Sequence, residues 1–412
     1  MELWKRNLFV LWIAQFITIM GMSLVVPFLP FFVRFLGVES EVQVSRWSGY
    51  VFAGPFLFSF FLTPLWGWLG DRKGQKPMVL RAIFGLALSQ ILISFSKNVE
   101  TLFILRVVQG ALSGFIPAAL ALVATSSPKK YSGYAIGMLS SSSSVGLVIG
   151  PLIGGVLADV LGYRAIFILV SALCIIAGIL VAVMVKEPPR IHVSPNRPYS
   201  LLENYQYVFS SKAITKGLIL ILVPQAAFMI VQPVFPLFVE SMIPGSSMKS
   251  TLTGMAFSIT GVFMTFSSPF WGKINDKKNA RLPISIALLT ASISFLLQAF
   301  TSSYAALLVY RCVLGASMGG ILPALYTYVS KCADDDRKGS VTGIASSFNI
   351  LANLLGPIAG GLLASFLVFE WNFVFASILT LSAVLFVSRF LPSLLDLGGN
   401  PNPHTTDVVQ DQ

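Results

Sequence analysis

A charged turn between two long apolar runs occurs twice in this chain, and this duplication limits the fold more than any other feature. Residues 64–73 read PLWGWLGDRK, and residues 269–278, 205 positions later, read PFWGKINDKK. Three other landmarks return in the same order: PFLP at 27–30 as PVFP at 233–236, RxxxG at 106–110 and again at 311–315, and GPxxGG at 150–155 and again at 356–361. A repeat of about 206 residues is far longer than a solenoid unit. The chain therefore consists of two homologous halves.

Composition indicates that both halves lie in a membrane. Hydrophobic residues make up 55% of the chain and charged residues 11%, and the mean hydropathy is +0.79. These values are typical of a polytopic membrane protein and exclude an ordinary soluble one. The net charge of +11 would suit a nucleic-acid-binding protein, but the basic residues fall in loops. We therefore expect a lipid bilayer around the chain and no nucleic-acid partner.

Twelve apolar spans, six in each half, predict an all-α polytopic membrane protein with two pseudo-symmetric six-helix bundles. Most have the roughly 20 apolar residues that cross a bilayer. The spans lie at 7–36, 46–70, 77–96, 101–125, 133–161, 163–186, 214–240, 250–272, 281–300, 303–330, 338–367 and 370–391. The predicted units are an N-terminal bundle at 1–186, a linker at 187–213, a C-terminal bundle at 214–391 and a tail at 392–412. Prolines inside several spans predict kinks.

The loops predict the orientation of the chain. Most of the 28 Lys and Arg residues lie near the two ends and in the loops on one side of the predicted bundles. By the positive-inside rule this side is cytoplasmic, and both termini lie there. The first span is too long for a signal peptide and has no cleavage site after it, so we expect it to be retained. The predicted location is the plasma (inner) membrane.

The linker and the tail differ in composition from the bundles. The linker opens with Glu187 and two prolines, and its segment 199–212 is either a helix on the membrane surface or a plain tether. After Pro392 the chain is rich in Gly, Asn, Pro and Thr, which predicts a disordered cytoplasmic tail. The three cysteines do not suggest a disulfide framework.

The turn after the second span carries the first functional motif. Gly67-x-x-x-Asp71-Arg72-x-Gly74-x-Lys76 combines glycines for a tight turn with a cluster of charges. Alone it could be a solvated loop whose basic residues set the topology. Together with the six plus six spans it resembles the signature of the major facilitator superfamily, and the resemblance covers almost the whole chain. It implies a conformational latch made by Gly67, Asp71, Arg72 and Gly74, with Asp71 facing the positive end of a helix in the other half.

Further motifs narrow the resemblance to one branch. They are GxxxxxPxxP at 21–30 in the first span, LRxxQG at 105–110 in the fourth, and Gly146-x-x-x-Gly150-Pro151-x-x-Gly154 in the fifth. Together they resemble the twelve-helix drug:proton antiporters of the DHA1 type, which export amphipathic compounds. The fifth-span motif is associated with export in that branch.

The fifth-span motif also has a physical interpretation. Gly146, Gly150 and Gly154 lie four residues apart, so they form a flat strip on which another helix can approach closely, and Pro151 bends the helix beside it. The strip could serve packing alone. We expect that packing to occur between the two halves, at the interface that moves during alternating access.

Arg106 and Arg311 lie inside the fourth and tenth spans. A charge there costs about 2.5–3.5 kcal/mol on insertion scales, so each arginine needs a partner or a function. Each could snorkel to the outer interface, or bond to carbonyls freed by the prolines of the first and seventh spans. The resemblance favours Arg106 in proton coupling, and Arg311 is its repeat counterpart.

No carboxylate is predicted in the middle of a span, although many drug:proton antiporters have one there. Asp159 and Glu240 fall near the outer ends of the fifth and seventh spans. With Arg106 they are the candidates for proton coupling, and Asp71 is a further acidic candidate. An interior that is neutral to positive weakens the case for lipophilic cations and favours neutral, zwitterionic or anionic substrates.

Polar and soft side chains at helical spacing predict the substrate cavity. Such stripes occur in the first, seventh and eleventh spans, and Met and Phe beside them suit a loosely specific pocket. Their amides could instead join helices, but facing lipid would be costly. The predicted substrate-binding residues are Gln15, Met22, Gln225, Phe228, Gln232, Asn349, Asn353 and Arg311.

These features predict a secondary active transporter that exports drugs or dyes against an inward proton flow by a rocker-switch movement. The alternative is export of an endogenous organic anion or zwitterion, such as a siderophore or metabolite. A receptor-like protein without flux is a third class, which the full motif set disfavours. Because the chain has two His and no nucleotide-binding loop, we expect no enzyme activity, no cofactor and no metal. The expected partners are a small molecule and protons, and we expect a monomer.

Overall fold

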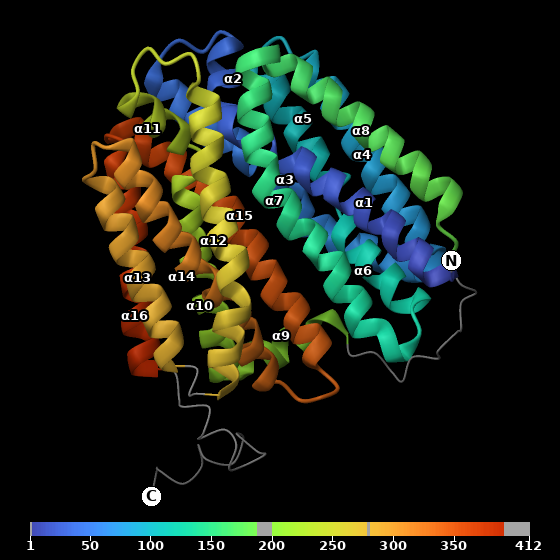
Figure 1. Cartoon of the computed structure of the whole chain (residues 1–412). Coiled ribbons are helices and arrows are strands. Elements are labelled where there is room, and N and C mark those ends of the chain that lie inside the picture. The colour runs from blue at the N-terminus through green and yellow to red at the C-terminus, as the bar shows by residue number, and fades with distance from the viewer. Residues whose placement is uncertain (1, 188–199, 278–280, 391–412) are drawn as a thin grey trace, which may run out of the picture.

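The computed structural model describes residues 2–187, 200–277 and 281–390, and these residues are almost entirely helical (Figure 1). The all-α fold predicted from the apolar spans is confirmed. The tail 392–412 and residues 188–199 of the interbundle linker lie outside the described residues.

The helices form two bundles, each with its own apolar core (Figure 1). The first bundle contains α1 (Leu3–Ser23), η1 (Val26–Phe28), α2 (Leu29–Phe35), α3 (Glu41–Lys73), α4 (Gln75–Ser94), α5 (Val99–Ala111), α6 (Phe115–Ser126), η2 (Lys129–Tyr131), α7 (Ser132–Leu161) and α8 (Tyr163–Met184). The second contains α9 (Leu201–Ser210), α10 (Lys212–Val231), α11 (Phe235–Met242), α12 (Lys249–Lys277), α13 (Arg281–Ala299), α14 (Tyr304–Lys331), α15 (Lys338–Phe366) and α16 (Glu370–Phe390).

The spans predicted from hydropathy correspond to these helices. Within the described residues, 11 helical spans are long and apolar enough to cross a membrane. The twelfth predicted span is α12, a helix of 29 residues that matches α3 in the repeat. The chain is a multi-pass membrane protein.

Three of the predicted spans are broken helices. The first and seventh spans break beside Pro27 and before Phe235, in the repeated proline motif. The fourth span breaks between α5 and α6, where Gly114 has a φ of +111° that favours glycine. The tenth span, its repeat counterpart, is the continuous helix α14. The proline kinks were predicted, whereas the break at Gly114 was not.

The segment between the bundles includes a short helix, so a plain tether over its whole length is wrong. Helix α9 begins with a capping box, in which Ser200 and Glu203 each accept a hydrogen bond from the other's backbone N–H. Leu202 and Phe209 are exposed on it. An apolar surface on a short helix at the end of the bundles suits a position at the membrane interface.

The two bundles meet along two seams at one end of the molecule. Helix α7 packs against α12 and α3 packs against α15, and α2 contacts α11 at the same end (Figure 1). We call this end the α2–α11 face, and the end where α1 begins the N-terminal face. The seams are close: a Cβ at Gly155 would clash with the Ser250 carbonyl oxygen, and one at Gly49 would lie 2.5 Å from that of Pro357.

Nearer the N-terminal face, the described parts of the seam helices α7 and α15 lack these close approaches between the bundles. No atom lies within 4 Å of a Cβ built at Gly137 of α7 or at Gly343 of α15. Tyr134 and Met138, on the same part of α7, are 65% and 42% exposed. The molecule is therefore closed at the α2–α11 face and open between the halves at the N-terminal face.

Candidate functional site

A cavity of about 420 Å³ lies between the two bundles and is lined by residues from both. Its walls are mostly apolar, with Phe and Met side chains prominent among them. The cavity includes six of the predicted substrate-binding residues and one predicted coupling residue, Arg106; the six are Met22, Gln225, Phe228, Gln232, Asn349 and Arg311. None of its lining residues is an Asp or a Glu. The predicted neutral-to-positive interior is confirmed for the residues that line this cavity.

Arg311 of α14 is the most deeply buried charge at the cavity. Its side chain is 1% exposed, and its guanidinium carbon lies 3.4 Å from the ring centroid of Phe235 and 5.7 Å from that of Phe257. Its Nε and Nη2 have no hydrogen-bond partner among the described residues. The guanidinium thus lies against ring faces at the cavity wall, with two buried donors unsatisfied.

Arg106 of α5 is 7% exposed and donates a hydrogen bond from Nη1 to Gln109 Oε1 at 3.0 Å. Its Nε has no partner among the described residues. Neither arginine reaches the outer interface, and neither bonds to a carbonyl freed by the prolines of the first or seventh span. Both structural alternatives considered from the sequence are therefore wrong for this conformation.

Amides of α10 and α15 form a chain beside the cavity. Gln225 Nε2 donates to Asn353 Oδ1 at 2.7 Å, and Asn353 Nδ2 donates to Asn349 Oδ1 at 3.3 Å. Gln225 and Asn349 line the cavity, whereas Asn353 lies behind them and orients both.

Gln15 does not line the cavity, and its assignment as a substrate residue is not supported. Its Nε2 donates to the Leu139 carbonyl oxygen at 3.1 Å and to Ser143 Oγ at 2.7 Å, and its side chain is 1% exposed. It joins α1 to α7 inside the first bundle. A buried amide that joins two helices has the same spacing in sequence as one that faces a cavity, so periodicity could not separate the two.

Several cavity residues were not predicted, and all of them except Ser23 and Thr260 lack a polar side chain. They are Ile19, Ser23, Val26, Phe52, Pro55, Phe56, Leu147, Phe257, Thr260, Gly261, Met264, Met318 and Leu322. Most lie on α3, α12 and α14, whose aromatic and thioether side chains are indistinguishable in sequence from lipid-facing ones. The sequence repeat could have indicated some of them, because it pairs α3 with α12 and so places both helices at equivalent positions in the two halves.

The glycine strip of α7 packs inside the first bundle, so the prediction that it lies between the halves is wrong. A Cβ at Gly146, Gly150 or Gly154 would meet residues of α1: Met20, Ser23 and Leu24 respectively. The seam with the second bundle is made instead by Gly155 and by Pro151, whose carbonyl oxygen faces Gly254 of α12. Adjacent helical residues lie 100° apart, so Gly155 faces a different neighbour from Gly154.

Asp159 caps a helix of the other bundle. Its carboxylate accepts hydrogen bonds from the backbone N–H of Ser250 at 3.3 Å, and from the N–H and Oγ1 of Thr251 at 2.8 Å and 2.7 Å. These groups belong to the first turn of α12, where a negative charge also interacts favourably with the helix dipole. Asp159 therefore closes the α7–α12 seam at the α2–α11 face. Its repeat counterpart is Ser365, whose hydroxyl donates, among the described residues, to the Leu362 carbonyl of its own helix.

Glu240 of α11 forms ion pairs across and within the bundles. Its carboxylate contacts Arg34 of α2 and Lys249 of α12. Arg34 also pairs with Glu41 of its own bundle at 2.7 Å. The pair of Arg34 with Glu240 joins the two bundles at the α2–α11 face. Neither Asp159 nor Glu240 lines the central cavity.

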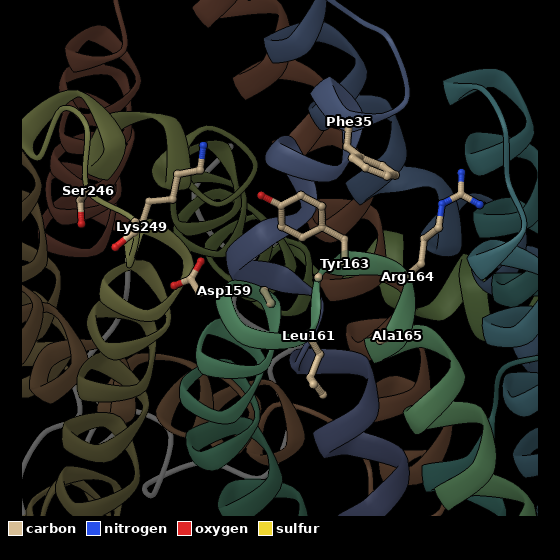
Figure 2. Close-up of a pocket in the computed structure, with 11 residues that line it drawn as sticks. Phe35, Asp159, Leu161, Tyr163, Arg164, Ala165, Ser246 and Lys249 are labelled. Atoms are coloured by element: carbon tan, nitrogen blue, oxygen red, sulfur yellow. The ribbon is translucent and has the colours of Figure 1, made fainter.

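A second cavity, of about 460 Å³, opens beside these acidic groups. Figure 2 shows Asp159, Lys249 and the hydroxyl of Tyr163 gathered on one side of it, while Arg164 points away. Arg164 instead donates to the carbonyl oxygens of Ser94 and Ser96 at the end of α4. This cavity belongs to the closed end of the molecule.

The latch motif lies at the N-terminal face and makes local contacts. Gly67, Asp71 and Arg72 are exposed, and Asp71 accepts a hydrogen bond from Gln75 Nε2 at 3.1 Å. Gly74, with φ of +110°, separates α3 from α4, whose first two N–H groups donate to the Glu187 carboxylate. The bundles are apart here, so the latch across them stays a prediction for the opposite conformation.

The sequence model of the Major Facilitator Superfamily matches residues 11–249 and 243–407. This chain belongs to that superfamily. It is a membrane transporter and not an enzyme.

Transporters of this superfamily include relatives that align along nearly the whole chain. The multidrug resistance protein MdtG of Enterobacter lignolyticus is 33% identical, over 99% of this chain and 96% of its own. MdtG of Proteus mirabilis is 34% identical over 91% and 93%. YuxJ of Bacillus subtilis, an MFS-type transporter, is 34% identical over 92% and 94%.

Solved transporter structures share the fold at low sequence identity. A bacterial homologue of the lysosomal transporter Spinster, in an inward-facing and occupied conformation, superposes with a TM-score of 0.78 at 15% identity, covering 96% of this chain and 98% of its own. A D-xylose–proton symporter gives 0.76 at 15%, covering 95% and 99%. At this identity the likeness establishes the fold alone.

Proposed function

We propose that this transporter exports small amphipathic compounds, including drugs and dyes, in exchange for protons across the bacterial inner membrane. The observation that carries the proposal is the apolar cavity, rich in Phe and Met, between two bundles that are closed at one end and open at the other. Adaptable side chains suit varied ligands. Relatives named as multidrug resistance proteins support the same function. The named relatives support drug export over export of a siderophore or metabolite.

In this proposal the basic N-terminal face is cytoplasmic, with both termini there, and the described conformation is inward-facing. The bundles rock about the cavity. The seams of α7 with α12 and of α3 with α15 then open while the N-terminal face closes. Asp71 reaches the other bundle in that outward-facing form, where the latch of residues Gly67, Asp71, Arg72 and Gly74 acts.

In this proposal, protons first bind to carboxylates at the α2–α11 face, which is the outer face. Ionised Asp159 caps α12 and adds a favourable charge at the start of the helix, and ionised Glu240 pairs with two cations. Protonation from the outer medium weakens both contacts and favours the outward-open form, in which substrate is released, and the protons leave to the cytoplasm after the bundles return to the inward-facing form. Arg106 is the coupling candidate that faces the cavity.

The test is substrate-evoked proton movement in proteoliposomes under an imposed pH gradient, with a lipophilic cation, a zwitterionic quinolone and a hydroxycarboxylate siderophore. Proton release evoked by the quinolone is expected, and a smaller response to the cation, because two arginines and no acidic residue line the cavity. Asp159→Asn is expected to slow this release by about tenfold, because an amide caps α12 without a charge. A response to the siderophore alone would overturn the drug-export function.

A further inference from the structure

The two arginines at the central cavity differ in what surrounds them. Arg106 already donates to Gln109. Arg311 is more deeply buried, at 1% exposed, and two of its nitrogens have no partner among the described residues. Buried donors without acceptors are costly, and a buried guanidinium more so than a neutral donor. The second bundle therefore carries a donor group that its own side chains do not satisfy.

The sequence repeat explains this difference. The counterpart of Gln109 in the second bundle is Leu314, which is buried in the core and offers no acceptor. Phe235 and Phe257 flank the guanidinium and hold its plane through cation–π contacts, but ring faces accept no directed hydrogen bonds in the guanidinium plane. An acceptor for Arg311 must come from the cavity.

We propose that Arg311 binds a carboxylate of the transported compound, so that the cavity prefers amphipathic organic anions and zwitterions to cations. The inference rests on the proposed export function and names the substrate class of the same site. A guanidinium presents parallel N–H donors that match the two oxygens of a carboxylate. The preference for anions also follows from charge, because both arginines and no acidic residue line the cavity.

The other residues that line the cavity indicate what the part of the compound beyond its carboxylate is like. Phe257 lies beside the guanidinium and also lines the cavity. Phe228, Phe52 and Met264 extend the apolar wall from other helices. An aromatic compound with one carboxylate fits both features of the cavity. Its carboxylate binds Arg311, and its ring packs against aromatic and thioether side chains.

The experiment uses three compounds with one scaffold: naphthylacetate, naphthylacetamide and naphthylmethyl-trimethylammonium. Binding to the purified full-length protein is measured by calorimetry, and flux by uptake into inside-out vesicles under a pH gradient. Naphthylacetate is expected to bind about tenfold more tightly than the amide, as one charge-assisted pair allows, and the ammonium compound more weakly than both.

Variants assign the preference to Arg311. Arg311→Gln is expected to bring the ratio of acetate to amide affinity close to one. Arg311→Lys, which keeps the charge but loses the planar fork, is expected to retain part of the ratio. Gln109→Leu, which copies the second bundle at the matched position, frees Arg106 and is expected to raise the ratio. If Arg311→Gln does not fold, the other two variants and the wild-type series still decide the question.

The outcomes separate this inference from the export function. Equal affinity of the wild-type protein for acetate and amide, or a preference for the ammonium compound, would overturn the anion site even if all three are transported. A preference for acetate in binding without any flux would support the site and overturn export. An acetate preference that survives Arg311→Gln would overturn the assignment to this residue.

Discussion

Neighbouring residues on one helix have separate functions in this protein. Gly154 of α7 lets α1 approach within the first bundle, whereas Gly155 lets α12 approach from the second. The first contact persists whenever the bundle is folded, and the second exists only while the α2–α11 face is closed. The two glycines therefore contribute to different equilibria, one to folding and one to alternating access.

Gly155→Ala is expected to shift the population toward the form open at the α2–α11 face. Its Cβ would clash with the Ser250 carbonyl oxygen, and overpacking of this kind costs about 1–3 kcal/mol. Spin-label distances across the α7–α12 seam measure the shift. Gly137→Ala, on the same helix with no atom within 4 Å of the new Cβ, is the matched control. An unchanged distance distribution in Gly155→Ala would show that the seam yields without opening.

At the scale of elements, the duplicated turn motif ties α3 and α12 to their neighbours. Trp66 Nε1 donates to the Ala111 carbonyl oxygen at 2.9 Å, and Trp271 Nε1 donates to that of Ala316 at 2.7 Å. Ala111 is the last residue of α5, before the break at Gly114. Arg81 stacks 3.6 Å from the Trp66 ring and donates to the Ser113 carbonyl. The bonds from Trp66 and Arg81 satisfy carbonyls that the break between α5 and α6 leaves free, whereas Ala316 lies within the continuous helix α14.

Trp66→Phe is expected to lower the free energy of unfolding of the first bundle by about 1–3 kcal/mol, because the Ala111 carbonyl loses its donor in a partly buried place. Thermal unfolding in detergent measures it. The control is Trp68→Phe, since Trp68 is 50% exposed and contacts Arg72 near the helix end. Equal loss of stability in both variants would mean that ring size, and not the indole hydrogen bond, decides the effect.

At the scale of the whole molecule, the closed face is held by groups that differ between the two seams. Asp159 caps α12 at one seam, while its counterpart Ser365 makes no bond to the first bundle among the described residues at the other. Glu240 adds an ion pair to Arg34 across the bundles. The pseudo-symmetric fold thus closes asymmetrically at the α2–α11 face, so a change of charge or protonation there is expected to affect its opening.

Glu240→Gln is expected to favour the form open at the α2–α11 face by about 1 kcal/mol, about fivefold in population, because Arg34 and Lys249 then face each other without the carboxylate. Spin-label distances between α2 and α11 measure the shift, and high salt is expected to reduce it. Glu41→Gln removes a partner of Arg34 within one bundle and is the control. A shift of the same size in Glu41→Gln would assign the effect to Arg34 alone.

The sequence by itself determined the membrane location, the duplicated halves, the helix spans and the position of the polar cavity stripes. These follow from hydropathy and a repeat, both of which can be read along the chain without knowing which helices are neighbours. The tertiary structure decided which face of each helix meets which neighbour. It placed Gln15 inside a bundle and the α7 glycines against α1, brought Asp159 to the start of α12, and left Arg311 without an acceptor. Helical periodicity defines a face but not its partner, because glycine strips and buried amides suit a neighbouring helix and a moving interface equally well.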